Sequence, residues 1–458
     1  MPIAQFSGLA SGIDSQSLID AYVEAIQKKN DLRKAEITEI TDQSDTLVEF
    51  KDKLKSLNDL IDKFRTANAG GLAKKASSID GSIATASVSS AAKNSSYALT
   101  VTSLANTATA SFDQSYSAST DVISAGGGDI SVVVGTGADQ ITIVKTLTGS
   151  TTIGDFVADF NADETNANRV VASSVNIGTE GSPDYRIVFN TLESGTDKGN
   201  IVISSTTAEL TTSTVNQASN AEFSIGGIGT SITRSSNTVS DIVSGVSFSL
   251  VDTGTTTITV TNDPDKTASE LQEVVEAYNE IVTFLAENNT VERVSNSSGA
   301  TNVYGKLAKT RTDNDFLSVF RGQISGTTST IGTAVKKLSE LGITTNRFDG
   351  TLNFDETAFK TAVSKDPTGV ADVLNKFADS TAGVNGVIYQ YTKTSGFIDT
   401  TIASNNSTIQ NISESIAQLD RRTDKVKARL TSQFSNLESV TAELQSKQSQ
   451  LSGILAGL

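Results

Sequence analysis

The residues that could perform chemistry in this chain are carboxylates, lysines and hydroxyl side chains, because its 458 residues include no Cys, His or Trp. The chain therefore lacks thiolate and imidazole nucleophiles, the usual general base and most ligand sets for zinc, copper, haem and iron–sulfur clusters. Two pairs of aspartates remain as candidate cation ligands, in Asp263-Pro264-Asp265 and in Asp313-Asn314-Asp315. Neither has the longer spacing of a calcium-binding loop, so both are interpreted as solvated turns, and no metal or cofactor is assigned.

Composition disfavours several other classes. Gly126-Gly127-Gly128 and Gly135-Thr136-Gly137 lack the downstream glycine and Lys of nucleotide-binding loops and are interpreted as β turns. The net charge of -16 disfavours nucleic acid as a partner, since a polyanion would be repelled. We find no apolar window long enough for membrane insertion and no signal peptide at the N-terminus. A catalytic role is the least favoured class of function.

The elements that must carry the function are long helices at both ends of the chain. From Ile402 onward, apolar residues recur with alternating spacings of three and four, which predicts one long helix with a single apolar stripe. Polar residues interrupt the stripe at Asn405, Thr423, Gln433 and Lys447. The stripe consists of Ile402, Ile409, Ile412, Ile416, Leu419, Val426, Leu430, Leu437, Val440, Leu444, Leu451, Ile454 and Leu458.

A similar period near the N-terminus predicts the partner helix, with Asp14 or Ser15 as N-cap and an end at Gly70-Gly71 after about Thr66. Its predicted apolar face consists of Ile19, Tyr22, Ile26, Ile40, Leu47, Phe50, Leu54, Leu57, Ile61 and Phe64. The stripe from Leu430 onward has no partner of matching quality except residues 19–40, where charged residues dilute the pattern. It could serve an internal bundle, an assembly contact, or both in different parts.

Between the two ends, residues from about 71 to 262 alternate in polarity over short segments rich in Val, Ile and Thr, which predicts β strands. One short predicted helix over 153–161 interrupts these strands. Further helices are expected over 267–287, over 305–325 and from Asp366-Pro367, with a hairpin turning at Asp349-Gly350. The predicted fold is multidomain α+β, a helical bundle and coiled-coil stalk built from both termini with inserted β-rich head subdomains. The predicted domains are leg helices at 1–42 and 403–458, a bundle with a small hairpin at 43–75 and 264–402, and head subdomains at 76–108 with 216–263 and at 109–215.

Four segments resemble one known family. These are Gly8-Leu9-Ala10-Ser11-Gly12-Ile13-Asp14 with Ser17-Leu18-Ile19, the run from Val243 to Leu250 with the strand 256–262 and the helix start at 274–279, the hairpin from Leu341 to Asp355, and the terminal heptad helix. In this order and spacing they are similar to the flagellar filament-capping proteins, the family also called hook-associated protein 2 (FliD type).

The resemblance implies a secreted homo-oligomer, a ring of about five subunits, at the distal tip of the bacterial flagellum. It implies that the cap promotes folding and insertion of exported flagellin during filament elongation, and that the chain is delivered by the flagellar export apparatus with a cytoplasmic export chaperone. The residues expected to self-associate and dock on the filament are Gly8, Leu9, Gly12, Ile13, Leu18, Ile19, Ile409, Ile412, Ile416, Leu419, Val426, Leu430, Leu437, Val440, Leu444 and Leu451. The alternatives are a flagellin-like or hook–filament junction subunit and an extracellular adhesin that uses the β-rich head.

Overall fold

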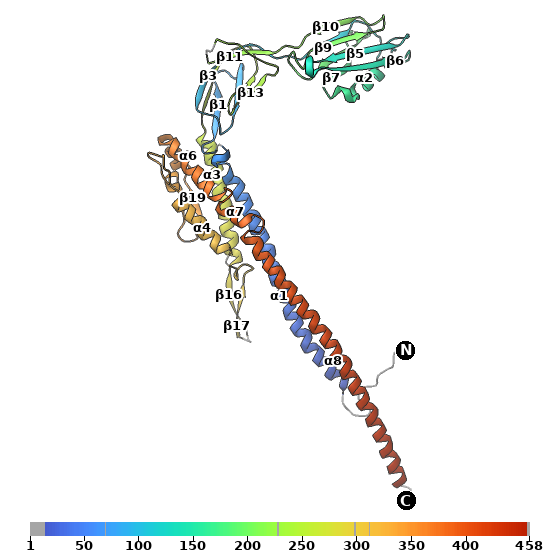
Figure 1. Cartoon of the computed structure of the whole chain (residues 1–458), viewed down its shortest axis with the longest axis vertical. Coiled ribbons are helices and arrows are strands. Elements are labelled where there is room, and N and C mark those ends of the chain that lie inside the picture. The colour runs from blue at the N-terminus through green and yellow to red at the C-terminus, as the bar shows by residue number, and fades with distance from the viewer. Residues whose placement is uncertain (1–13, 69, 227–228, 297–298, 311, 456–458) are drawn as a thin grey trace. The chain divides into compact units, whose positions relative to one another are not determined.

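The computed structural model describes residues 14–68, 70–226, 229–296, 299–310 and 312–455. The chain divides into two compact units (Figure 1). A helical unit comes from both ends of the chain, up to residue 67 and from residue 268 onward, and a β-rich unit comes from residues 68–267. No helix among the described residues is long and apolar enough to cross a membrane.

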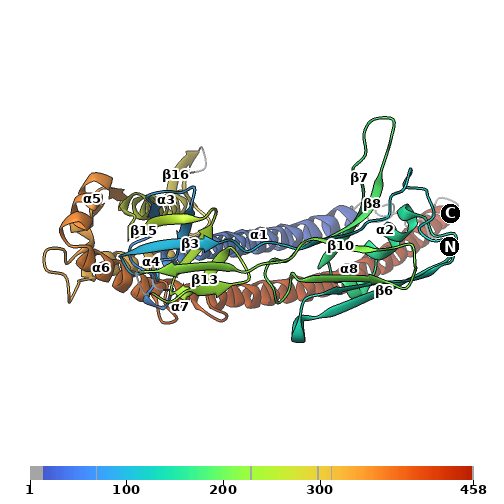
Figure 2. The same ribbon diagram turned by 90° about the horizontal axis from the view of Figure 1, so that it is seen from above.

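Two long helices from opposite ends of the chain lie side by side in the helical unit (Figures 1 and 2). They are α1 (Ser15–Asp62) and α8 (Phe397–Leu455). The remaining elements of this unit are α3 (Pro264–Asn288), β16 (Val291–Asn296), β17 (Gly299–Tyr304), α4 (Thr312–Gly326), the 3₁₀ turn η4 (Leu338–Leu341), β18 (Ile343–Thr345), β19 (Leu352–Phe354), α5 (Glu356–Lys365), α6 (Pro367–Thr381) and α7 (Val387–Thr392).

Local signals explain where α1 begins and ends. The Asp14 side chain accepts a hydrogen bond of 3.0 Å from the backbone N–H of Ser17, as expected of an N-cap. The helix ends at Asp62, earlier than predicted, because Asp379 of α6 binds both the backbone N–H and the hydroxyl of Thr66 and draws the chain out of the helical path. A 3₁₀ turn, Thr66–Asn68, follows.

Aromatic side chains fill the centre of the helical unit. The Tyr278 and Phe320 rings stack at 5.2 Å, Phe316 lies 5.4 Å from Phe320, and Phe50 of α1 meets Phe316 edge-on at 5.7 Å. All four side chains are fully buried. Because each ring comes from α1, α3 or α4, this cluster joins the N-terminal helix to the helices that follow the β-rich unit.

The predicted hairpin near Asp349-Gly350 is confirmed. Strands β18 and β19 pair antiparallel, and Gly350 has a φ of 76°, which a residue with a Cβ rarely adopts. A Cβ at this position would also lie 2.0 Å from the Arg321 guanidinium. The Asn279 side chain holds the backbone N–H and C=O of Leu352 at 2.7 and 2.9 Å, which fixes the hairpin against α3.

The helix predicted over residues 305–325 is wrong in its first part. Helix α4 begins at Thr312, and the preceding residues close the hairpin of β16 and β17, where the N–H of Gly305 bonds to the carbonyl of Thr290 at 2.7 Å. Because the hairpin uses the backbone groups of this segment, the helix starts after it.

Asp366 is the most heavily hydrogen-bonded carboxylate in the described helical unit. It caps α6, where its Oδ1 accepts the N–H of Gly369, and its Oδ2 accepts N–H groups of residues 333–335 at 2.7 to 3.2 Å. These backbone donors, those of Ala334 and Gly369 above all, hold the pKa of Asp366 well below its ordinary value. The charged form is therefore preferred in the folded state.

We expect the helical unit to lose stability in acid through this group. Since the folded pKa lies below the unfolded one, the contribution is fully present above about pH 5 and is lost as pH falls through the folded value. Urea midpoints at about pH 7 and about pH 3 should differ less in Asp366→Asn than in the native chain. Asp355→Asn is the control, because Asp355 caps α5 through one N–H of Ala358. Equal pH dependence in native and Asp366→Asn chains would contradict this prediction.

The β-rich unit contains two separate apolar cores. One core takes residues from Ala84 to Ala105 and from Ala221 to Val260, and the other takes residues from Ala108 to Ala218. The first is enclosed by sheets of order β1-β15-β3-β11-β12 and β13-β14-β2, and the second by sheets of order β10-β4-β8-β7 and β6-β5-β9 with helix α2. The first and last strands of the β-rich unit, β1 and β15, thus pair in one sheet.

The strands alternate in burial where the sequence alternates in polarity, and α2 (Ile153–Asn161) has the predicted bounds. Thr152 caps α2 through the N–H of Asp155. The strands are β1 (Lys74–Ser78), β2 (Ala84–Val88), β3 (Ser95–Ser103), β4 (Thr109–Phe112), β5 (Gly128–Val134), β6 (Ile141–Leu147), β7 (Val170–Asn176), β8 (Tyr185–Thr191), β9 (Ile201–Ser205), β10 (Thr212–Asn216), β11 (Ala221–Ile225), β12 (Ile232–Arg234), β13 (Thr238–Val243), β14 (Val246–Leu250) and β15 (Gly254–Asn262).

Candidate self-association and filament-docking surface

Helices α1 and α8 form an antiparallel coiled coil whose register is fixed by three polar contacts. Lys51 forms an ion pair with Asp399, Asn405 donates a hydrogen bond to Ser44, and Asn30 donates a hydrogen bond to Asp420. In each pair the two residue numbers add up to 449 or 450. A residue of α1 therefore lies level with the residue of α8 whose number completes that sum.

Two of the four polar residues that interrupt the α8 stripe, Asn405 and Thr423, lie inside this coiled coil. The Asn405 amide donates to Gln43 Oε1 and Ser44 Oγ, both at 3.0 Å. Thr423 is buried, and the buried Asn30 of α1 donates to Asp420 Oδ1 at 2.6 Å near the same level. Paired polar side chains in an apolar seam favour one register over its alternatives, so these layers specify how the two helices align.

The Lys51–Asp399 ion pair marks the upper end of the seam. Its hydrogen bond and charge lower the pKa of Asp399, and the N–H of Ser395 adds a weaker contact. Asp399 lies in the first turn of α8, where a negative charge also favours the helix. The pair therefore anchors the start of α8 to α1.

The part of the stripe between Ile409 and Leu430 is covered by α1. Its side chains are half-buried, as are Val23, Ile26 and Ile37 on the facing side of α1, and Ile19 is fully buried. The residues of this covered part are Ile409, Ile412, Ile416, Leu419, Val426 and Leu430. They hold the two helices together.

The stripe beyond Leu430 is open. The described part of α1 begins at Ser15, level with about residue 435 of α8, so the last turns of α8 extend past it (Figure 1). The exposed fractions there are 44% for Leu437, 54% for Val440 and 61% for Leu444. Leu451 and Ile454 are exposed to 61% and 66%. We define Leu437, Val440, Leu444, Leu451 and Ile454 as the open stripe.

The structure corrects one member of the predicted seam and leaves others outside the described residues. Tyr22 was predicted to face the seam but is 42% exposed, because the seam continues from Ile19 by a spacing of four residues, to Val23. Leu18 is likewise exposed, at 56%, beside the buried Ile19. The predicted residues Gly8, Leu9, Gly12 and Ile13 lie outside the described part of the chain.

Sequence reasoning missed the hairpin of β16 and β17. Val291, Val303 and Tyr304 on this hairpin are between 45% and 57% exposed. Lys309 holds it near α1, since its ammonium lies 5.1 Å from the Tyr304 ring centroid and also pairs with Glu39. The available signal in the sequence was the β-branched residues Val291 and Val294 before Gly299 and Val303 after it.

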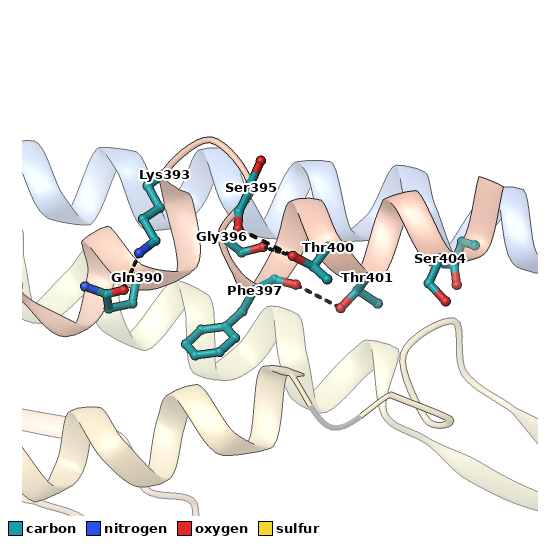
Figure 3. A pocket seen from close by; sticks show the side chains of 9 residues that line it. Gln390, Lys393, Ser395, Gly396, Phe397, Thr400, Thr401 and Ser404 are labelled. Atoms are coloured by element: carbon teal, nitrogen blue, oxygen red, sulfur yellow. Dashed lines mark hydrogen bonds between the residues drawn. The ribbon is translucent and has the colours of Figure 1, made fainter. Parts of the chain in front are cut away.

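An open pocket of about 560 Å³ lies at the turn between α7 and α8 (Figure 3). Its polar groups are engaged with one another. Lys393 donates to Gln390 Oε1 at 2.6 Å, Thr400 to the carbonyl of Gly396 and Thr401 to the carbonyl of Phe397. Phe397, 57% exposed, adds apolar contact area. The pocket offers no converging nucleophile and base, and no group of three or more acidic residues among the described residues could hold a metal.

Comparison with known proteins agrees with this architecture. Residues 11–108 match the family model "Flagellar hook-associated protein 2 N-terminus", and residues 218–446 match "Flagellar hook-associated protein 2 C-terminus". The chain is 26% identical to the A-type flagellar hook-associated protein 2 of Pseudomonas aeruginosa, covering 99% of this chain and 97% of that protein. It is 29% identical to the B-type protein of the same species over about half of each, 53% and 51%.

The fold is also similar to a solved one. The crystal structure of the flagellar cap protein FliD D1-D2-D3 domains from Escherichia coli aligns with a TM-score of 0.57 at 21% identity, covering 80% of this chain and 99% of that one. This confirms the predicted α+β fold, in which long terminal helices pack together and β-sheets lie between them in the sequence. The chain therefore belongs to the flagellar hook-associated protein 2 (FliD) family, and it is a structural, non-enzymatic protein of the flagellar filament cap, which sits on flagellin outside the cell at the filament tip.

Proposed function

We propose that this cap promotes the folding and insertion of exported flagellin subunits, and that the open stripe of α8 is the surface by which each leg docks on the filament end. The observation that carries the proposal is the contrast along one helix. The stripe is covered by α1 up to Leu430 and exposed from Leu437 onward. Among the described residues this part of α8 keeps its apolar side chains exposed. A long apolar stripe in that state is marginal in water, and we propose that a partner molecule covers it.

The leg in this proposal consists of residues 1–42 and 403–458, and Leu18 adds to the docking surface beside the open stripe. The covered residues Ile409 to Leu430 and Ile19 act indirectly, because they hold α1 and α8 in register. Gly8, Leu9, Gly12 and Ile13 are proposed to join the docked leg. In this proposal about five copies of the chain assemble into a ring.

Delivery through the export apparatus with a chaperone is part of the same proposal. A chain without Cys has no disulfide that would have to be absent during unfolded export and formed afterwards outside the cell. The absence of Cys from the sequence is therefore compatible with this route of delivery.

Electron microscopy of the purified chain on short flagellin filaments tests the proposal. We expect one ring of subunits at a single end of each filament, and growth beneath that ring when flagellin monomers are added. Viewed along the filament, the ring gives the number of copies directly. Decoration along the filament sides, or growth that proceeds equally at uncapped ends, would contradict the proposal.

A further inference from the structure

Positive charge is concentrated at one level of the leg, although the chain as a whole is strongly acidic. The level shared by residues 21–34 of α1 and 416–429 of α8 contains nine basic and four acidic residues, a local charge of +5 in a chain of net charge -16. By the register of the coiled coil, the two segments occupy about 20 Å of the leg. We define the basic band as Lys28, Lys29, Arg33, Lys34, Arg421, Arg422, Lys425, Lys427 and Arg429.

The basic band is exposed and almost free of ion pairs. Only Arg33 is half-buried, and the other eight side chains are exposed. Within the described part of the chain, the band's one ion pair joins Lys34 to Asp31 at 3.8 Å, with both side chains more than 60% exposed. An exposed ion pair of this kind contributes little to stability, so most of the band's positive charge is not neutralised by acidic side chains.

The like charges also oppose the packing of the leg itself. Lys29 and Arg422 both occupy positions that flank the seam, at nearly the same level of the antiparallel pair. Flanking positions of a coiled coil usually carry opposite charges, and like charges there destabilise the pair. The leg thus carries a repulsion that a negatively charged partner would relieve.

We propose that the basic band docks on a carboxylate-rich face of the protein subunits at the filament end. This inference rests on the proposed docking of the legs, and it names the chemistry of the partner surface. The band lies directly next to the open stripe, since Arg429 precedes Leu430 and Leu437 follows two turns later. Charge would guide the leg to the filament end, and the open stripe would then supply the lasting contact.

A second copy of this chain does not fit the band in a ring. Rotational symmetry places the same residues of every copy at the same height, so neighbouring legs would bring one basic band beside another. Acidic side chains such as Glu49 and Glu280 lie on the bundle, level with a part of α1 about 30 Å along the helix from Lys29. A neighbour at equal height cannot bring them to the band.

The test compares two variants of the full chain that carry the same change in charge. In the band variant, Arg421, Arg422, Lys425 and Lys427 are changed to Gln, which has a similar helix propensity. In the control variant, Lys306, Lys336, Arg347 and Lys365, which are exposed residues of the helical unit outside the leg, are changed to Gln. The association rate with immobilised short flagellin filaments is measured at increasing NaCl, and self-association is followed by sedimentation.

We expect the native chain and the control variant to associate roughly tenfold more slowly at high salt than at low salt. The band variant should start roughly tenfold slower at low salt and change little with NaCl. Equal losses in both variants, or the same salt dependence in the band variant as in the native chain, would overturn the inference. So would a band variant that changed self-association but not filament binding. A native chain that failed to bind filament ends at any salt would instead refute the proposed function.

Discussion

Changing Leu437, Leu444 and Leu451 to Ser is expected to abolish capping of filament ends while the melting temperatures of the free protein stay within about 1 °C. All three side chains are exposed in the free chain, so their loss removes no internal core. On docking, each buried leucine contributes about 2 kcal/mol, and losing three weakens binding of a subunit roughly ten-thousandfold. Binding to short filaments and thermal melting measure the two effects separately.

The matched control for this variant places three serines on the same segment but off the open stripe, at Ala442, Gln448 and Gln450. These changes also lower helix propensity, so they test whether weakening of the helix alone reduces capping. The control should cap nearly as well as the native chain. A stripe variant that lost its fold together with its function would show that Leu437, Leu444 and Leu451 are internal core.

Changing Phe320 to Ala is expected to lower the stability of the helical unit strongly. The ring is fully buried and contacts Tyr278, Phe316 and Phe377 with centroid distances of 5.2 to 5.9 Å. Removing a buried Phe from such a cluster costs about 3–5 kcal/mol, which lowers the melting temperature of a unit this size by roughly 10 °C. Calorimetry of the full chain should show the transition of the helical unit shifted.

Phe189→Ala is the matched control, because Phe189 is equally buried in the second core of the β-rich unit, against Phe112, Phe156 and Phe160. It should lower the transition of the β-rich unit and leave that of the helical unit unchanged. If either variant shifted both transitions together, the two units would melt as one, and the division into separately stable cores would be wrong.

Patterns that extend over many residues predicted the structure best. The terminal heptads predicted α8 and its pairing with the N-terminal helix, and the apolar spacing over residues 153–161 gave α2 its observed bounds. Such patterns average over many side chains, so a few polar residues do not obscure them. The apolar stripe of α8 could be predicted from the sequence for the same reason.

Short or polar elements could not be predicted in this way. Strand β10 reads Thr-Ser-Thr-Val-Asn and β1 reads Lys-Lys-Ala-Ser-Ser, and neither contains enough apolar alternation to be told from a loop. Their pairing with β4 and β15 supplies the missing stabilisation. Tyr22 was placed on the wrong face because one shift in spacing separates it from Val23, and only the partner helix decides between them.

The register of the coiled coil also lay beyond the sequence. Asn405 was read as an interruption of the stripe, and its bonds to Gln43 and Ser44 became clear only when α1 was placed against α8. The same alignment places Ser15, the first residue of α1, level with about residue 435 of α8, and the open stripe begins just beyond that level. The weaker N-terminal pattern predicted a change near Leu430, and the structure places it between Leu430, which is half-buried, and Leu437, which is 44% exposed.

Hydrogen exchange on the chain, free and bound to short filaments, tests the docking of the open stripe most directly. In the free protein, amides of residues 437–455 should exchange rapidly, while those of 409–430, which pack on α1, should be protected. On filament ends, the amides of 437–455 should become protected as well, and those of 409–430 should change little. Strong protection of residues 437–455 in a dilute free monomer, or continued rapid exchange there in the bound cap, would contradict the account.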